Sequence, residues 1–568
     1  MSDTVKKKIS IGVEDFKEII DKDGYFVDKT LMIKKLIESQ AKVTLFTRPR
    51  RFGKTLNQFM IRRFFEDECT EKGEKVDNGY LFEGLKITEC GEEILKHQQQ
   101  YPVIFLTLKS AKQPTYEMAY ACLVDEICKE FERHSYVLQG EMSQRNREIF
   151  ERISLGKGSD DEYATAFAFL SECLFKYHKK KAIILIDEYD VPLENAYFRG
   201  FYDEMIDFIR SLFESALKTN PYLEKSVITG CLRISKESIF TGLNNLKVDS
   251  VLRTEYGDSF GFTESEVEEM LAYYNLQEEL PEVKRWYDGY LFNDIEIYNP
   301  WSIINYVYDR DHKITQFALP YWSNTSSNSI IREMVGEADQ KAKADLETLI
   351  NGGTIEKQVH EDITYGDIHQ SQDNLWNFLF FTGYLKKMSE RKDESGESLY
   401  LSMAIPNTEI KTIYKNSISY WFEQRMKETD RSPLVRALET GDCEAAENFI
   451  SEQLFHTISY YDYAENFYHG FMAGLLVNIG GYLVRSNRES GNGRPDIVMT
   501  ESKFRGRAMI LELKISDTIK DMEKKCEEAL TQMEEQKYAV PLEDNGYQPI
   551  LKYAVCFFKK GCIVRKAE

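Results

Sequence analysis

Residues 42–55 read KVTLFTRPRRFGKT, and this stretch sets the fold of the first half of the chain. A short apolar run comes first, a loop containing Pro49 and Gly53 follows, and the amphipathic segment LNQFMIRRFFE begins directly after the loop. We expect a strand, a loop and a helix in that order. Backbone N–H groups at the start of such a helix bind phosphate, while a lysine contacts the outer phosphates and a hydroxyl group contacts Mg²⁺. The residues assigned to this task are Arg51, Phe52, Gly53, Lys54 and Thr55, with Thr55 on the metal.

The loop departs from the phosphate-binding (P-loop) consensus at its first position. In GxxxxGK[ST] the first glycine falls at Arg48. The arginines at 48, 50 and 51 either face a nucleotide or are merely solvated, and the sequence leaves both interpretations open. A GKT tripeptide taken alone is more often a chance match than a site, so the assignment depends on a matching second half.

That second half is AIILIDEYD at residues 182–190. An apolar strand that ends in Asp187 and Glu188 would let Asp187 hold Mg²⁺ through water and Glu188 polarise the attacking water. The alternative is a buried strand that happens to end in two acids. Two further strand candidates lie at 101–108 and 225–232, and long helical stretches separate the candidates. Short apolar strands that alternate with helices predict a parallel α/β sheet.

The composition limits the function classes. With 568 residues the chain exceeds one ordinary core, so several domains are expected. No apolar run is long enough to cross a membrane, and we predict a cytoplasmic protein without a membrane partner. Ten cysteines without a CxxC pair argue against a zinc site. The net charge of −21 argues against a protein that coats nucleic acid nonspecifically, so any nucleic-acid contact must be local.

Seven motifs together resemble a known family. They are YFVDKT (25–30), RPRRFGKT (48–55), LIDEYD (185–190), VITGCLRIS (227–235), FTGLNNL (240–246), WYDGY (286–290) and YNPWS (298–302). The chain is similar to AAA-ATPase-like proteins, related to archaeal-type and STAND ATPases, that carry a C-terminal PD-(D/E)XK nuclease-like domain. The phosphate loop of that family similarly begins Arg-Pro-Arg-Arg-Phe-Gly-Lys. The resemblance implies an NTP-binding core, with Thr229 at a sensor-like position and Arg233 reading the γ-phosphate.

The expected fold class is α/β with several domains. Residues 1–260 are predicted to form a P-loop NTPase domain with a parallel sheet, and residues 261–410 a helical lid with a winged-helix-like region. A helical linker is predicted for 411–455 and an α/β domain of restriction-endonuclease type for 456–568.

A second candidate site lies in RPDIVMTESKFRGRAMILELK at residues 494–514. If the two apolar runs form a hairpin, Asp496 heads one strand, while Glu512 and Lys514 point to one face of its neighbour. Carboxylates suit Mg²⁺, with Mn²⁺ as a further option, and a lysine orients water or stabilises charge on a phosphodiester. This is the PD-(D/E)XK pattern, and it assigns Asp496 and Glu512 to the metal and all three residues to catalysis.

The surroundings of this pattern add two candidates. Domains of this type often place an acid on the first helix, and Glu465 takes that place as a further metal ligand. His469 lies one turn later, and an active role and a core role are both open. Between residues 485 and 514, lysines and arginines outnumber acids, as expected of a site that binds a polyanion; ordinary surface charge is the alternative.

The leading hypothesis is an ATP-binding, ATP-regulated and metal-dependent nuclease that hydrolyses DNA phosphodiester bonds, with Glu188 catalysing ATP hydrolysis. The alternative is a STAND-like switch that binds nucleotide, and nucleic acid or a protein, without cutting. A helicase-like motor is a weaker third hypothesis because further helicase motifs are absent from the sequence. ATP, Mg²⁺ and DNA are thus the expected ligands, and a homo-oligomer remains an option.

Overall fold

The computed structural model describes residues 6–232, 239–240, 245–324, 331, 339–360, 372–456, 465–477, 479–486, 493–503 and 505–567. The chain divides into two compact units. The first contains Met1–Ser326 and Thr354–Thr412, and the second contains Ser327–Gly353 and Ile413–Glu568. In the part of the chain that is described, no helix combines the length and apolar character needed to cross a membrane.

The first unit is built on a five-stranded parallel sheet with the strand order β2-β3-β4-β1-β5. All residues of β1 and β3 are buried, as expected for central strands that helices cover on both faces. This confirms the parallel α/β sheet that the sequence predicts. The strands are β1 (Val43–Thr47), β2 (Val103–Thr107), β3 (Ala182–Asp187), β4 (Leu223–Gly230) and β5 (Leu246–Asp249).

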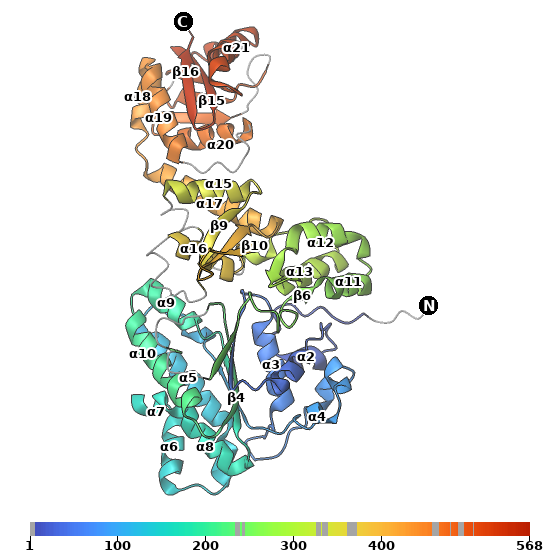
Figure 1. Ribbon diagram of the computed structural model, residues 1–568. Helices are drawn as coiled ribbons and strands as arrows, with labels where there is room; N and C mark the ends of the chain where they lie inside the picture. Colours follow the sequence, from blue (N-terminus) through green and yellow to red (C-terminus); the bar gives the residue numbers. More distant parts are fainter. Residues whose placement is uncertain are drawn as a thin grey trace. The chain divides into compact units, whose positions relative to one another are not determined.

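Helices cover both faces of this sheet. Figure 1 shows α3 on one side of the strands and α5, α8 and α10 on the other. The helices are α1 (Phe16–Asp21), α2 (Leu31–Glu38), α3 (Lys54–Phe65), α4 (Glu92–Leu95), α5 (Tyr116–Arg133), α6 (Gln144–Ser154), α7 (Asp160–Ala164), α8 (Ala166–His178), α9 (Val191–Arg199) and α10 (Tyr202–Phe213).

The remainder of the first unit contains helices and two small antiparallel sheets, ordered β6-β8-β7 and β10-β11-β9. The aromatic motifs at 286–302 contribute buried rings, among them Tyr287, Tyr290 and Tyr298. The elements are β6 (Phe262–Thr263), α11 (Glu264–Tyr273), α12 (Leu280–Tyr287), β7 (Tyr290–Phe292), β8 (Ile295–Tyr298), α13 (Pro300–Asp311), β9 (Ile355–Val359), α16 (Gln372–Phe381), β10 (Lys386–Lys392) and β11 (Leu399–Ala404).

The second unit holds a five-stranded mixed sheet with the order β12-β13-β14-β15-β16, in which only β14 and β15 pair in parallel. Its helices include α15, which comes from the middle of the chain, and α17 begins in the first unit. The elements are α15 (Gln340–Ile350), α17 (Thr408–Glu428), α18 (Ser432–Thr440), α19 (Cys443–His456), α20 (Glu465–Leu476), β12 (Tyr482–Ser486), β13 (Ile497–Glu501), β14 (Ala508–Ile515), α21 (Met522–Glu535), α22 (Val540–Asp544), β15 (Ile550–Phe558) and β16 (Gly561–Lys566).

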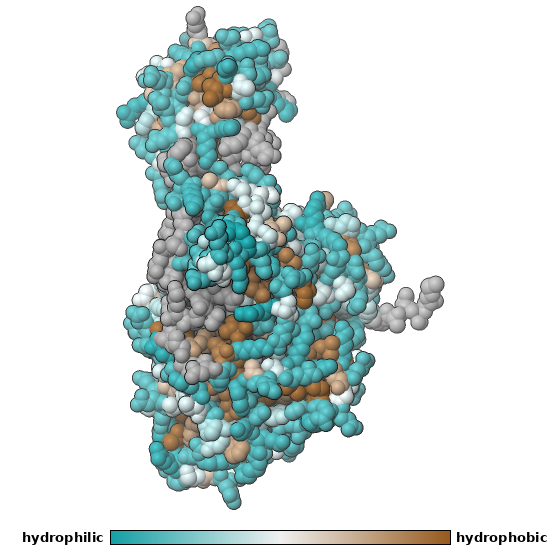
Figure 2. Space-filling view, in the orientation of Figure 1, coloured by the Kyte–Doolittle hydropathy of each residue, from teal (hydrophilic) through white to brown (hydrophobic). Residues whose placement is uncertain are grey.

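The core of the second unit lies between this sheet and the helices α18, α19 and α20, whose apolar residues form one cluster. On the other face α21 packs against β15 through Cys526 and Ala529. The molecular face in Figure 2 is mostly hydrophilic, in keeping with the charged fraction of 29 %.

Candidate functional site

The loop between β1 and α3 has the shape of a phosphate site. Gly53 has φ +83° and Arg51 has φ +71°, so the chain turns sharply before α3 begins at Lys54. The ammonium group of Lys54 donates to the carbonyl oxygens of Arg48 and Pro49, both at 3.1 Å. Among the described residues, none accepts a hydrogen bond from the main-chain N–H groups of Arg51, Phe52 or Gly53. Unpaired N–H groups at a helix start form an anion-binding site.

The ends of β3 and β4 bring the second half of this site to the loop. Because β1 lies beside β4 and β4 beside β3, their carboxyl ends meet at one edge of the sheet. Asp187 accepts hydrogen bonds from Thr55 Oγ1 at 2.8 Å and from Thr229 Oγ1 at 2.7 Å. Glu188 forms an ion pair with Lys54 at 3.3 Å. Five residues assigned from the sequence therefore lie together, although their roles remain predictions.

The electrostatics of this cluster favour a bound cation. Burial and the neighbouring Glu188 raise the pKa of Asp187 to about 6. Burial also works against the charge of Lys54, but Cys231, Glu188 and Asp190 outweigh it and raise the pKa of Lys54 above its usual value. Glu188 Oε2 is buried without a hydrogen-bond partner. Hard oxygen atoms gathered in this way fit Mg²⁺.

Arg48 is neither nucleotide-facing nor solvated, so both interpretations of this residue are wrong. Its side chain is fully buried, and its guanidinium donates to the carbonyl oxygen of Asp249 at 2.8 Å and to the Asp249 carboxylate. Asp249 ends β5, which pairs with β1. The arginine that replaces the first consensus glycine therefore ties the loop to the edge strand.

The other loop side chains also contact protein. Arg50 forms an ion pair with Glu194 of α9, and the Arg51 guanidinium lies 4.4 Å from the ring centroid of Trp301. The Phe52 ring packs edge-on against Tyr290, with centroids 5.0 Å apart. The assignment of Arg51 and Phe52 to a nucleotide thus rests on their backbone rather than on their side chains.

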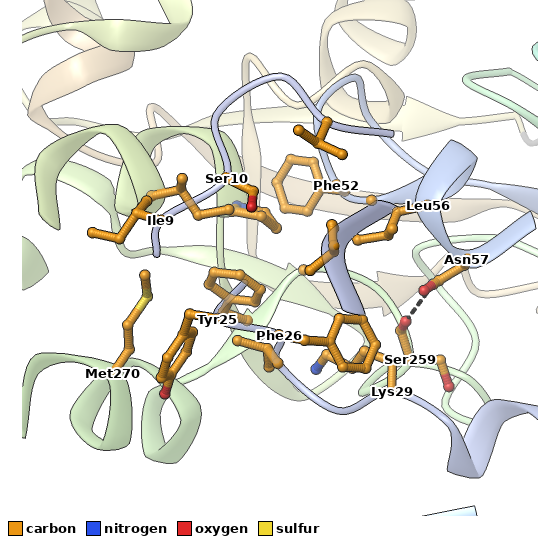
Figure 3. A pocket seen from close by; sticks show the side chains of 18 residues that line it. Ile9, Ser10, Tyr25, Phe26, Lys29, Phe52, Leu56, Asn57, Ser259 and Met270 are labelled. Carbon is orange, nitrogen blue, oxygen red and sulfur yellow. Dashed lines mark hydrogen bonds between the residues drawn. The ribbon is translucent and has the colours of Figure 1, made fainter. Parts of the chain in front are cut away.

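An apolar recess of about 80 Å³ lies beside the loop. Figure 3 shows Ile9 and Ser10 of the N-terminal segment on the same upper side as Phe52, with Leu56 to the right and Tyr25 and Phe26 below. Asn57 of α3 donates to the Ser259 carbonyl oxygen at 2.8 Å and closes one end. The walls suit an uncharged ring, but a space that holds several waters is too small for a purine unless a wall shifts.

Lys109 is a member of this site that the sequence interpretation missed. Its ammonium group donates to Thr55 Oγ1 at 2.8 Å and lies 3.7 Å from Asp187 Oδ2. Its place in the sequence could have identified it, because Lys109 lies two residues after the end of β2, and the last residue of β2, Thr107, pairs with Asp187.

In the second unit, β13 and β14 form the antiparallel hairpin that the sequence predicts. The Leu513 N–H donates to Asp496 Oδ2 at 2.7 Å, so the carboxylate lies next to the backbone between Glu512 and Lys514. Lys514 Nζ lies 3.4 Å from Glu512 Oε1. The hairpin therefore brings the two acids and the lysine together.

Gln532 of α21 completes this cluster. Its amide nitrogen donates to Glu512 Oε1 at 2.6 Å, and its oxygen accepts from Lys514 at 2.7 Å. Burial, and then the charge of Asp496, raise the pKa of Glu512 to about 7 although Lys514 opposes the shift. Glu512 Oε2 is buried without a hydrogen-bond partner. An orphaned carboxylate oxygen beside a second acid fits a divalent ion.

The His469 side chain contacts the backbone of Asp496 rather than its carboxylate. Its Nε2 lies 3.2 Å from the Asp496 carbonyl oxygen and 2.9 Å from Ser486 Oγ. It supports the turn into β13 and contacts no acid side chain of the cluster in the described residues. Arg233 and the side chain of Glu465 lie outside the described part of the chain.

The basic residues near the hairpin are exposed. They are Arg485, Arg494, Lys503 and Arg505, whereas Arg507 is half-buried and forms an ion pair with Glu439 at 3.1 Å.

Two family models match separate parts of the chain. Residues 10–240 match the family model described as predicted AAA-ATPase, and residues 463–567 match the PD-(D/E)XK nuclease superfamily. The chain joins an AAA-ATPase-like region to a PD-(D/E)XK nuclease-like domain. The AAA-ATPase-like region contains the loop, β3 and Thr229, and the nuclease-like domain contains the hairpin and Gln532.

A curated protein of Azotobacter chroococcum mcd 1 is also similar. It is described as an uncharacterized protein in the vnfD 5' region and is 25 % identical over 344 residues. The similar region covers 58 % of this chain and 57 % of that protein, so the chain spans little more than half the length of this relative.

Proposed function

We propose that the protein binds and hydrolyses ATP and that its nucleotide state controls a metal-dependent cleavage of DNA. Support comes from the two clusters of acids and lysine, which lie in regions that match an ATPase family and a nuclease superfamily. The observation that carries the proposal is Glu512, a buried acid with an unpartnered oxygen, held beside Asp496 and Lys514.

In the nucleotide site, the loop N–H groups and Lys54 bind phosphate oxygens. Thr55 and Asp187 hold Mg²⁺, which when bound neutralises phosphate charge. Glu188 orients the attacking water, and its unpartnered Oε2 is available to accept a proton from it. Thr229 fixes the Asp187 carboxylate through its hydroxyl group.

In the nuclease site, Asp496 and Glu512 hold Mg²⁺ or Mn²⁺, which when bound activates water and polarises the phosphodiester. Lys514 positions the water and stabilises negative charge on phosphate oxygens. Gln532 orients the side chains of Glu512 and Lys514 through one hydrogen bond to each. The exposed arginines and Lys503 supply contacts to the DNA backbone.

The test is cleavage of plasmid and linear DNA with Mg²⁺ or Mn²⁺, with and without ATP. Asp496→Ala and Lys514→Ala should abolish cutting, and Asp517→Ala, which alters an exposed acid outside the cluster, should not. Cutting that survives in the first two variants would defeat the assignment. Metal and nucleotide binding without strand scission in the wild type would favour the switch.

A further inference from the structure

Lys109 takes a place that the proposed function reserves for a metal ion. The Thr55 hydroxyl donates to Asp187 at 2.8 Å and accepts from Lys109 at 2.8 Å, so its hydrogen-bonding capacity is engaged on both sides. The ammonium group is also 3.7 Å from Asp187 Oδ2. Thr55 and Asp187 are the two groups assigned to Mg²⁺, which needs direct or water-bridged access to these oxygens.

The main sheet holds the backbone next to Lys109 in place. The Leu108 N–H donates to the Asp187 carbonyl oxygen at 3.0 Å, which anchors the backbone directly before Lys109 to the end of β3. The Lys109 side chain is 35 % exposed, so its flexible stem has room to move while the backbone stays in place.

Glu14 also accepts hydrogen bonds from the Lys109 ammonium group. Both carboxylate oxygens accept from Lys109, at 2.9 and 2.8 Å. An ion pair this exposed contributes little stability, which argues against a mainly structural role. Glu14 follows Val13, and Val13, Ile9 and Ser10 line the recess beside the phosphate loop. The Lys109–Glu14 pair therefore links the metal position to the wall that must shift before a ring enters.

We propose that Lys109 is a second phosphate-binding lysine of the nucleotide site, an inference that rests on the proposed ATP binding. Without nucleotide, its ammonium group neutralises Asp187 and occupies the position of the divalent ion. When nucleotide and ion enter, Lys109 leaves Thr55 and contacts the outermost phosphate. A cation that reaches the terminal phosphate distinguishes ATP from ADP and stabilises the charge that develops there.

The first part of the proposal, called here the resting role, is that Lys109 occupies the ion's position when no nucleotide is bound. It is tested by titrating nucleotide-free protein with Mn²⁺ and measuring the free ion by electron paramagnetic resonance. A Glu512→Gln background removes the second site from the signal. In this background Lys109→Met should tighten Mn²⁺ binding about tenfold, the change expected from one hydrogen bond to a charged group. Lys112→Met removes an exposed lysine three residues away and should change nothing. Unchanged Mn²⁺ affinity in Lys109→Met would overturn the resting role.

The phosphate role is tested by calorimetry with Mg²⁺ and either ADP or a non-hydrolysable ATP analogue. Lys109→Met should lower the preference for the analogue over ADP about tenfold, because any gain in Mg²⁺ binding is common to both nucleotides, while Lys109→Arg should retain part of the preference. An unchanged ratio of the two affinities would overturn the phosphate contact. If the wild type binds neither nucleotide, the proposed ATP binding fails, and the Mn²⁺ measurement still decides the resting role.

Discussion

The two sites use the same three residue types but differ in how the metal-binding acid is satisfied. In the AAA-ATPase-like region both oxygens of Asp187 accept hydrogen bonds, and two lysines lie within 4 Å of the surrounding acids. In the nuclease-like domain one oxygen of Glu512 is buried without a partner, and one lysine accompanies it. The acids of the first site thus lie beside two lysines, whereas those of the second lie beside one. We therefore expect a divalent ion to bind the nuclease site first when nucleotide is absent.

Glu512→Gln should produce the largest effect. A neutral amide removes one of the two carboxylates that hold the ion, and bound metal contributes several kcal/mol to a phosphodiester reaction. DNA cleavage should fall about 10³-fold, since each 1.4 kcal/mol is tenfold. Calorimetry with Mn²⁺ should show the loss of one site, while ATP turnover stays within twofold of wild type. Cleavage at the wild-type rate would remove Glu512 from the mechanism.

Lys54→Ala should reduce ATP turnover by about 10²–10³-fold, because it removes charge stabilisation from the transferred phosphate. Phosphate release is the measurement, and Lys72→Ala, an exposed lysine, is the control. Mn²⁺ binding at the nuclease site should be unaffected. If Lys54→Ala also abolishes that binding, the two sites are not independent and the contrast drawn above is wrong.

Gln532→Ala should weaken metal binding and cleavage about 10–100-fold, the range typical of a residue that orients a metal ligand. Gln532 contacts Glu512 and Lys514 but is not assigned to the ion. Thr531→Ala alters the exposed neighbouring residue and serves as the control. A Gln532→Ala protein with normal Mn²⁺ affinity would show that Lys514 alone aligns Glu512.

The pH profiles of the two activities should be offset. Glu512, with a pKa of about 7, is protonated below pH 7 and must lose that proton to bind metal, so cleavage should fall about tenfold per pH unit below 7. Asp187 has a pKa of about 6, so ATP turnover should begin to fall one unit lower. Cleavage and phosphate release measured from pH 5 to 9 give both profiles, and coincident profiles would contradict the assignment.

The main sheet and the β13–β14 hairpin were predictable because their signals are local. The buried parallel strands are largely apolar, Asp496 directly precedes β13, and Glu512 and Lys514 lie in the adjacent strand β14. Strand pairing then needs only a short connection between β13 and β14.

Other features depend on partners far away in the sequence. The role of Arg48 is set by Asp249, 201 residues later, on a four-residue edge strand without a strong apolar pattern. Lys109 acquires its contacts from Glu14, 95 residues earlier, and Thr55, 54 residues earlier. No spacing within a single segment predicts such pairs, because sheet order determines them.

The origin of α15 has a consequence for how the protein is made. Residues 340–350 belong to the second unit, yet the chain returns to the first unit for residues 354–412 before the rest of the second follows. During synthesis this helix leaves the ribosome well before the sheet and before Lys560, in the turn between β15 and β16, whose ammonium group lies 2.7 Å from Glu347. A clone that starts at residue 413 would omit this helix and the ion pair between Glu347 and Lys560.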